Sequence, residues 1–186
     1  SSLNKVKLGM IGNYNVAYKG YNTALRTLKR LECNHPGFYR LELVGGGSKI
    51  EIMKQAKQLG VDHCIKFRGV LAFPEEIFLW LDTVDIFLQP SETEGKPRAL
   101  IEAISRGCAG VGSNVGGIPE LLPCDMVINP KDYIQLEAKI VELSAKNRLI
   151  SASNDSFKIA QEYEYSYLKV KRDSFYKRVK QELNND

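Results

Sequence analysis

The sequence predicts an α/β fold, an open parallel sheet of about six strands with helices on both faces, and three observations support it. Apolar segments of strand length alternate with segments whose apolar residues recur at helical spacing. The segment 84–88 is apolar except at Asp85, as in a strand covered on both faces. Five of the predicted strands run into loops that contain glycine. Together these features indicate a three-layer α/β/α arrangement.

Turn-forming residues and apolar spacing set the bounds of the predicted elements. Ser48 is expected to cap the helix that follows the second strand, and Gly60 to end it. The strands are predicted at 6–11, 41–44, 64–67, 84–88, 109–112 and 126–128. The helices are predicted at 18–31, 48–59, 74–81, 97–106, 132–146 and 155–183, the last with a break near 163–167.

The composition fits one globular domain over residues 1–186, without a linker or a repeat. No apolar run approaches the roughly 18 residues of a membrane span, and the first residues lack the apolar core of a signal peptide. The cysteines lie far apart without a CxxC pair, so metal-ligand spacing is absent. We expect reduced, largely buried thiols in a cytosolic protein at Cys33, Cys64, Cys108 and Cys124.

The net charge of +4 is mild and gathers toward the C-terminus. One interpretation is a solvated helix face, and the other is attraction to an anionic membrane surface, worth about 1 kcal/mol per basic residue near the lipid. Nucleic acid is not expected as a partner, because no aromatic and basic platform accompanies the charge. The basic residues concerned are Lys169, Lys171, Arg172, Lys177, Arg178 and Lys180.

The most informative segment surrounds the predicted turn between the fourth strand and the next helix. Glu94 and Glu102 are separated by seven residues and offer carboxylate acceptors for hydroxyl groups. Between them, Gly95 lets the backbone approach a ligand closely, and Pro97 suits the first helical turn. The N–H groups of that turn and the helix dipole favour an anion such as a diphosphate. The alternative is an ordinary exposed turn in which Glu102 pairs with a neighbouring arginine, Arg98 or Arg106.

Two other glycine-bearing loops carry charge or resemble known phosphate loops. Lys19 precedes Gly20 at the start of the first helix, where it would either neutralise a phosphate as a point charge or stay in solvent. The loop 45–47 consists of three glycines but has Ile50 where the third glycine of a G-x-G-x-x-G motif belongs. It is therefore weak support for a dinucleotide site.

The stretch 113–120 resembles the segment around Glu94 in its arrangement: a predicted strand ends, paired glycines follow, and a proline comes next. Pro119 is expected to start a short helix, although a tight structural turn explains the glycines equally well. His35 and His63 lie in polar loops without a partner at catalytic or metal-binding spacing, so we interpret them as surface residues. The acidic residues flanking the fourth strand lie at the wrong end of it for a metal ion, and none is expected.

Read together, these residues resemble the donor-binding half of retaining glycosyltransferases that have two facing Rossmann-like domains, the GT-B fold. This large family is called group 1 or family 4, and its signature is a pair of glutamates separated by seven residues, as at Glu94 and Glu102. The resemblance covers about residues 6–145 and implies one Rossmann-like half of a GT-B fold. The other matching pieces are Lys19-Gly20, 43–47, 67–70, 85–91, Gly107 and 116–120.

The resemblance implies a role for each matching residue. Glu94 would hold hydroxyls of the donor sugar, Glu102 the ribose hydroxyls, and Lys19 the charge of the leaving diphosphate. The family's chemistry retains the anomeric configuration and uses neither a metal ion nor a cofactor, the nucleotide-sugar being a substrate. Catalysis is expected from Glu94 and Lys19, and donor binding from Gly12, Asn13, Lys19, Val70, Leu71, Glu94, Gly95, Lys96, Pro97, Arg98, Ala99, Leu100 and Glu102.

The chain departs from the family pattern in two places. An arginine usually accompanies the lysine of the first loop, but the stretch 12–15 has none, so Lys19 acts alone or with Arg98. The family's N-terminal, acceptor-binding domain has no counterpart here. We therefore expect an isolated donor-binding half whose helical segment at about 155–184 packs on the missing domain.

The sequence thus predicts the donor domain of a hexosyl- or N-acetylhexosaminyl-transferase, inactive by itself. The expected partners are a UDP-sugar and a glycan or lipid-linked acceptor, in the synthesis of a bacterial surface polysaccharide such as O-antigen or capsule. The expected location is the cytoplasm or, peripherally, the inner face of the plasma membrane. Two alternatives stay open, half of a nucleotide-sugar epimerase of the same architecture and a non-enzymatic flavodoxin-like module.

Overall fold

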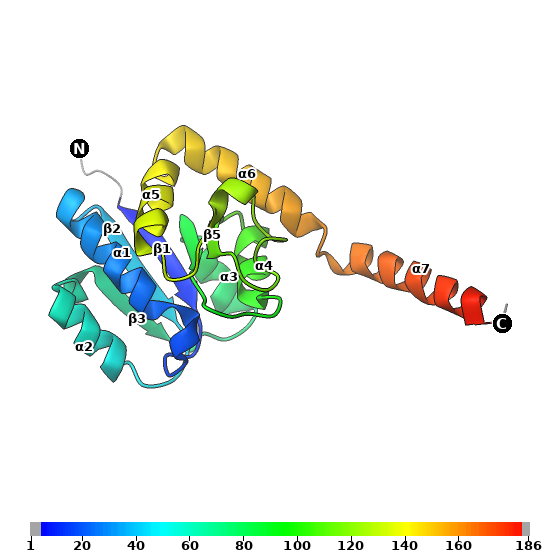
Figure 1. The fold of residues 1–186 in the computed structure, drawn as a ribbon, viewed down its shortest axis with the longest axis horizontal. Coiled ribbons are helices and arrows are strands. Elements are labelled where there is room, and N and C mark those ends of the chain that lie inside the picture. Colours follow the sequence, from blue (N-terminus) through cyan, green and yellow to red (C-terminus); the bar gives the residue numbers. More distant parts are fainter. Residues whose placement is uncertain (1–4, 184–186) are drawn as a thin grey trace.

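The computed structural model describes residues 5–183, and within them the six strands form one parallel sheet in the order β3-β2-β1-β4-β5-β6. Helices cover both faces of this sheet (Figure 1), so the predicted three-layer α/β/α architecture is confirmed. The strands are β1 (Val6–Ile11), β2 (Tyr39–Val44), β3 (Ile65–Gly69), β4 (Ile86–Gln89), β5 (Ala109–Ser113) and β6 (Val127–Ile128).

Apart from α7, the helices form two groups on opposite faces of the sheet. Within the described part of the chain they are α1 (Tyr21–Asn34), α2 (Ile50–Leu59), α3 (Glu75–Leu81), α4 (Arg98–Ser105), α5 (Tyr133–Leu143), α6 (Lys146–Gln161) and α7 (Tyr165–Leu183), with short 3₁₀ turns η1 (Ala17–Lys19), η2 (Asp62–Cys64) and η3 (Cys124–Met126). Helix α1 packs against α2 and α5, whereas α4 packs against α3 and α6. This division follows from right-handed crossovers that run in opposite directions from the sheet centre.

The direction of winding reverses between β1 and β4, the two central strands. Leu8 of β1 pairs with Ile86 of β4 in parallel, while the connections that follow these strands lead to opposite halves of the sheet. A crevice forms outside the carboxyl ends of the strands at such a switch point, and ligands bind there in open α/β folds. The topology therefore brings the loop after β1 beside the loop after β4.

In the described strands the buried side chains are mostly apolar, and one of them, that of Glu42, is charged. Phe87 and Ile86 of β4 are fully buried, which explains why this strand has apolar residues on both faces. Glu42 of β2 is 1% exposed and accepts hydrogen bonds from Arg68 at 2.8 and 3.1 Å and from Trp80 at 2.8 Å. Burial alone would raise the pKa of Glu42, but these hydrogen bonds, together with the positive charges of Lys7 and Arg68, outweigh it and lower the pKa.

Several predicted element ends differ from the structure. Ser48 is not the cap of α2, because Lys49 occupies the N-cap position without a side-chain hydrogen bond. No helix starts at Pro119, since the segment after β5 forms consecutive turns instead. Pro97 is the N-cap residue of α4 and not its first helical residue. The end of α2 at Gly60, with a left-handed φ of 71°, is confirmed.

The C-terminal helices begin earlier than predicted. Helix α5 ends at Leu143 and α6 begins at Lys146, nine residues before the predicted start at 155. The predicted break near 163–167 is confirmed, because α6 ends at Gln161 and α7 begins at Tyr165. Beyond the break, α7 projects away from the sheet and its helices (Figure 1). Residue 184, the end of the predicted segment, lies outside the described residues.

The four cysteines differ in burial. Cys64 and Cys108 are buried, but Cys33 and Cys124 are exposed, so the prediction of largely buried thiols is wrong for half of them.

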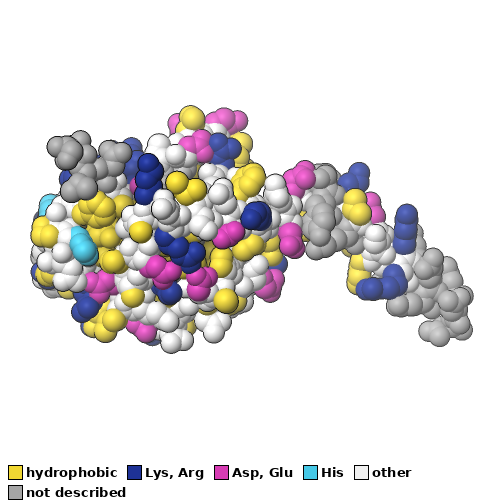
Figure 2. All heavy atoms as spheres, turned by 90° about the horizontal axis from the view of Figure 1, so that it is seen from above, with side chains coloured by type: hydrophobic (Ala, Val, Ile, Leu, Met, Phe, Trp, Pro, Cys, Tyr) yellow, Lys and Arg dark blue, Asp and Glu magenta, His cyan; other side chains and the backbone are white. Residues whose placement is uncertain are grey.

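Figure 2 shows basic side chains at the surface of the projecting helix α7. Among residues 5–183, no helix is long and apolar enough to cross a membrane.

Candidate functional site

A cavity of ≈ 300 Å³ opens at the carboxyl ends of β1 and β4, where the winding of the sheet reverses. It is bounded by the end of β1, the turn η1, the end of β4 and the first turns of α4. This is the position in which open α/β sheets bind ligands. Of the predicted site residues, the cavity brings together Gly12, Lys19, Glu94, Lys96, Pro97, Arg98, Ala99 and Glu102.

Glu94 lines this cavity and is held by three donors. Lys19 Nζ lies 2.6 Å from Glu94 Oε1, and the same oxygen accepts from Gln89 Nε2 at 2.8 Å and from Ser91 Oγ at 3.0 Å. The Glu94 side chain is only 10% exposed and that of Lys19 is 22% exposed. Because all three bonds end on Oε1, the second carboxylate oxygen is the one left to accept from a ligand.

Two glycines fix the loop that carries Glu94. Gly20 has a left-handed φ of 78°, and a Cβ at this position would lie 1.9 Å from the carbonyl oxygen of Pro90. Gly116 has a φ of 52°, and its Cβ would lie 2.0 Å from the carbonyl oxygen of Glu94 itself. Any other residue at these positions would push the backbone of the loop away. The close approach of the chain on both sides therefore sets the position of the Glu94 carboxylate.

Glu102 also lines the cavity, from the second turn of α4. In the described part of the chain no hydrogen bond or ion pair reaches its carboxylate, and Arg106, one of its expected partners, pairs instead with Asp82 at 2.7 Å. Partial burial raises the pKa of Glu102, and the nearby charge of Arg98 opposes this only in part. The interpretation of Glu102 as one partner of a surface ion pair with Arg106 is thus wrong.

Between the two carboxylates, α4 presents its N-terminus to the cavity. The helix begins at Arg98, and the first N–H groups of a helix have no intrahelical acceptor. Together with the dipole of α4, Lys19 and Arg98 make this part of the cavity attractive to an anion. The cavity therefore combines two carboxylates with an anion-binding region at the N-terminus of α4.

A sequence profile described as "Glycosyl transferases group 1" matches residues 5–146, most of the chain. The match covers both loops that form the cavity and both glutamates. The chain belongs to the group 1 glycosyl transferases. Membership gives the paired glutamates and the lysine a functional context that their geometry alone does not supply.

Curated relatives support this membership and show how much of a longer protein the chain represents. "Protein CapJ" of Staphylococcus aureus is 30% identical over 184 residues, covering 98% of this chain and 46% of that protein. The amylovoran biosynthesis glycosyltransferase AmsK of Erwinia amylovora is 36% identical over 111 residues, covering 56% of this chain and 27% of AmsK. The chain thus spans about half the length, or less, of the curated relatives it matches.

Solved structures of low sequence identity share the fold. The C-terminal domain of a group 1 glycosyl transferase, LpcC of Francisella tularensis, superposes with a TM-score of 0.77 at 23% identity, covering 87% of this chain and 88% of that one. Anabaena HepE, solved in complex with UDP and glucose, gives a TM-score of 0.80 at 19% identity, covering 95% of this chain and 48% of HepE. The described chain accordingly has the fold of one Rossmann-like half of a GT-B glycosyltransferase.

Five of the predicted site residues lie outside the cavity of this group 1 domain. Asn13 Oδ1 accepts from Asn15 N at 2.9 Å within the loop after β1. Val70 is 77% exposed, and Leu71 faces a different hollow beside α3. Leu100 is fully buried in the core, and Gly95 is exposed on the loop above. Their roles toward a nucleotide stay predictions.

Sequence reasoning missed two polar residues that support Glu94. Gln89 is the last residue of β4 and Ser91 follows two positions later, and both are buried. A glutamine closing an otherwise apolar strand was the available signal, because a buried amide needs a hydrogen-bonding partner. In this group 1 domain that partner is the carboxylate of Glu94.

Lys96, one of the predicted donor-binding residues, has partners of its own in this structure. Its Nζ lies 2.8 Å from Glu120 Oε2 and 4.7 Å from the centre of the Tyr163 ring, which adds a cation–π contact. Tyr163 is in the break between α6 and α7. Lys96 therefore joins the loop after β4 to the segment from which α7 departs.

A larger cavity of ≈ 470 Å³ lies beside the site, between the loop after β1 and α2. It contains neither of the paired glutamates and no lysine or arginine. Tyr21 lies in its wall, and the hydroxyl of Tyr21 is buried without a hydrogen-bonding partner among the described residues. We place the function in the smaller cavity, because only there do carboxylates, cations and a helix N-terminus meet.

Proposed function

We propose that this chain is the donor-binding domain of a retaining hexosyl- or N-acetylhexosaminyl-transferase that uses a UDP-sugar. The observation that carries the proposal is the meeting of Lys19, Glu94 and Glu102 around one cavity at the switch point of a group 1 glycosyl transferase domain. In this arrangement Glu102 accepts from the ribose hydroxyls, the N-terminus of α4 binds the diphosphate, and Glu94 accepts from the sugar.

The proposed chemistry relies on charge stabilisation at the leaving diphosphate. Lys19 and the free N–H groups of α4 are positioned to stabilise the negative charge that develops as the bond to the sugar breaks. Arg98 lines the same cavity and supplies a second positive charge, because the loop after β1 has no cation besides Lys19. We propose that no metal ion or cofactor takes part in the transfer.

We further propose that the full protein makes a bacterial surface polysaccharide at the cytoplasmic face of the plasma membrane. The name of one relative, the amylovoran biosynthesis glycosyltransferase AmsK, supports a substrate of this class. A glycan or lipid-linked acceptor would bind to a part of the protein outside this chain. The projecting α7, which exposes Val170 and Phe175, is proposed to pack on that part.

Calorimetric titration with UDP tests the donor assignment. The chain is expected to bind UDP saturably, and Glu102→Ala is expected to bind at least about tenfold more weakly, since hydrogen bonds to a charged acceptor contribute about 1.5–3 kcal/mol. Glu75→Ala, which removes an exposed glutamate from α3, is the matched control and should bind like the unchanged chain. Equal UDP affinities for the Glu102→Ala and unchanged chains would refute the ribose assignment, and no binding of UDP by either would favour a non-enzymatic module.

A further inference from the structure

A second cluster of chemically reactive side chains lies far from the cavity, at the opposite edge of the sheet. Glu32 belongs to the last turn of α1, and His63 and Cys64 belong to η2, directly before β3 begins at Ile65. Because all the strands are parallel, the start of β3 lies at the edge opposite the carboxyl ends that hold Glu94 and Glu102. The cluster is therefore separate from the proposed donor site.

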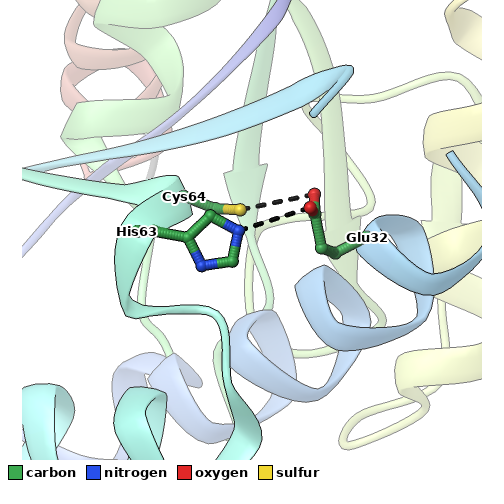
Figure 3. A group of neighbouring side chains, drawn as sticks. All are labelled: Glu32, His63 and Cys64. Carbon is green, nitrogen blue, oxygen red and sulfur yellow. Dashed lines mark hydrogen bonds and ion pairs between the residues drawn. The ribbon is translucent and has the colours of Figure 1, made fainter. Parts of the chain in front are cut away.

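The three side chains converge on a common point. Figure 3 shows the imidazole of His63 and the thiol of Cys64 side by side, both facing the carboxylate of Glu32. His63 Nε2 lies 3.3 Å from Glu32 Oε1, Cys64 Sγ lies 3.4 Å from Glu32 Oε2, and the ligand atoms all lie within 4.8 Å of one another. Ligands bound tetrahedrally to zinc at about 2.0–2.3 Å are separated by about 3.3–3.7 Å. The contacts of His63 and Cys64 with Glu32 already have this spacing, and the three ligand atoms together would draw in from their limit of 4.8 Å on binding an ion.

The chemistry of the three groups matches the preferences of zinc. One sulfur, one imidazole nitrogen and one carboxylate oxygen are the ligand types that zinc takes in proteins. The backbone N–H of Gly37 donates to Glu32 Oε2 at 3.0 Å and fixes the carboxylate, as outer-shell donors do at metal sites. Cys64 is buried while His63 is exposed, so one side of the cluster is open to solvent.

We propose that Glu32, His63 and Cys64 bind a zinc ion, with water as the fourth ligand. On binding, the Cys64 thiol releases its proton to solvent, and the resulting thiolate bonds to the metal in place of its hydrogen bond to Glu32. The ion would join the end of α1 to the start of β3, two elements that are 31 residues apart in sequence between Glu32 and His63. A metal ion in this position stabilises the fold and takes no part in sugar transfer.

Cobalt provides a spectroscopic probe of this site. Burial and the Glu32 carboxylate, with a smaller contribution from Asp62 opposed by Lys5, raise the pKa of Cys64 to about 11, so the thiol is protonated in the metal-free chain at neutral pH. Titration of the reduced, tag-free chain with Co²⁺ is expected to produce a thiolate-to-cobalt charge-transfer band and the visible bands of tetrahedral cobalt. Addition of Zn²⁺ should then abolish both signals.

Matched variants separate this site from adventitious binding. Cys64→Ser should lose the charge-transfer band, whereas Cys33→Ser, which changes an exposed cysteine beside Glu32, should keep it. Because Cys64 is buried and its replacement could perturb folding, His63→Ala at an exposed position gives a second test, with His35→Ala as its control.

The expected loss of Zn²⁺ affinity in His63→Ala is more than about tenfold, since even outer-shell substitutions cost 10–100-fold. The proposal is overturned if the unchanged chain shows no charge-transfer band with Co²⁺. It is equally overturned if the band persists in Cys64→Ser, or if His63→Ala and His35→Ala bind Zn²⁺ alike.

Discussion

The cavity is lined by two glutamate carboxylates whose surroundings differ: one accepts hydrogen bonds from the protein, and the other accepts none among the described residues. On the loop after β4, Glu94 accepts three hydrogen bonds on one oxygen, from Lys19, Gln89 and Ser91. On α4, Glu102 is partly buried, and no hydrogen bond reaches its carboxylate within the described part of the chain. One carboxylate is stabilised by the protein itself, and the other is left for a ligand.

This difference teaches how a single cavity can bind two parts of one ligand. A carboxylate held by neighbouring donors has a fixed position, which suits a group that must align with a reacting sugar. A carboxylate that is partly desolvated and unpaired gains more from an incoming hydroxyl, which suits a group that supplies affinity. In the proposed donor site, we therefore assign positioning of the sugar chiefly to Glu94 and affinity for the nucleotide chiefly to Glu102.

The largest expected effect comes from changing Gly20, which holds the loop of Glu94 in place. In Gly20→Ala the new methyl group would overlap the Pro90 carbonyl oxygen, so the free energy of unfolding should fall by more than about 2 kcal/mol and UDP binding should weaken. Gly37→Ala is the control, because Gly37 has a similar φ of 70° but no neighbouring atom within 4 Å. It should lose only about 1 kcal/mol through backbone strain.

Urea denaturation and UDP titration of the two glycine variants measure the difference. If Gly20→Ala were no less stable than Gly37→Ala and bound UDP normally, the close contact with Pro90 would not be what fixes the loop. The fixed position that distinguishes Glu94 from Glu102 would then need another explanation.

A smaller effect is expected from removing the cation that faces Glu94. Lys19→Ala should weaken binding of UDP about tenfold, because the diphosphate loses its positive partner and faces the Glu94 charge directly. Binding of uridine, which has no phosphate, should not change. Lys54→Ala removes an exposed lysine from α2 and serves as the control. Equal losses for UDP and uridine would show that Lys19 acts on the shape of the cavity and not through its charge.

The smallest expected effect concerns the stability contribution of Glu102. Its pKa is raised above the ordinary value of 4.5, so the ionised carboxylate destabilises the folded chain at neutral pH. Glu102→Gln should therefore raise the free energy of unfolding at pH 7 by less than about 1 kcal/mol, and this gain should vanish as the pH falls below 4.5. Urea titrations across this pH range measure it, with exposed Glu75→Gln as the unaffected control. A variant less stable than the unchanged chain would mean that Glu102 has a structural partner.

Much of the fold could be predicted from the sequence, because short apolar strands and glycine-ended helices leave strong local signals. The start of α6 could not, since the junction between Leu143 and Lys146 contains neither glycine nor proline. Conversely, Pro119 gave a helix-start signal that tertiary packing overrode, because the turn there closes against the loop of Glu94 through the hydrogen bond from Gly117 N to Gly95 O.

The site was predictable only as far as its local motif. The spacing of Glu94 and Glu102 lies within one segment, but the ion pair between Lys19 and Glu94 joins residues 75 positions apart. The Glu32, His63 and Cys64 cluster went unnoticed for the same reason, because motif rules detect short ligand spacings and not pairs joined by packing. Such contacts depend on strand order, which no local pattern records.

In the proposed donor site, the hydrogen bonds to Glu94 would also limit how well this residue selects a sugar. Since all three donors end on Oε1, a hydroxyl of the ligand has one carboxylate oxygen to approach. One hydrogen bond to a charged group contributes about 1.5–3 kcal/mol, and two epimers that differ at that hydroxyl would be distinguished by at most about 10- to 150-fold. Higher fidelity between sugars would require a second contact, so donor specificity in the full protein is expected to be shared between Glu94 and residues elsewhere.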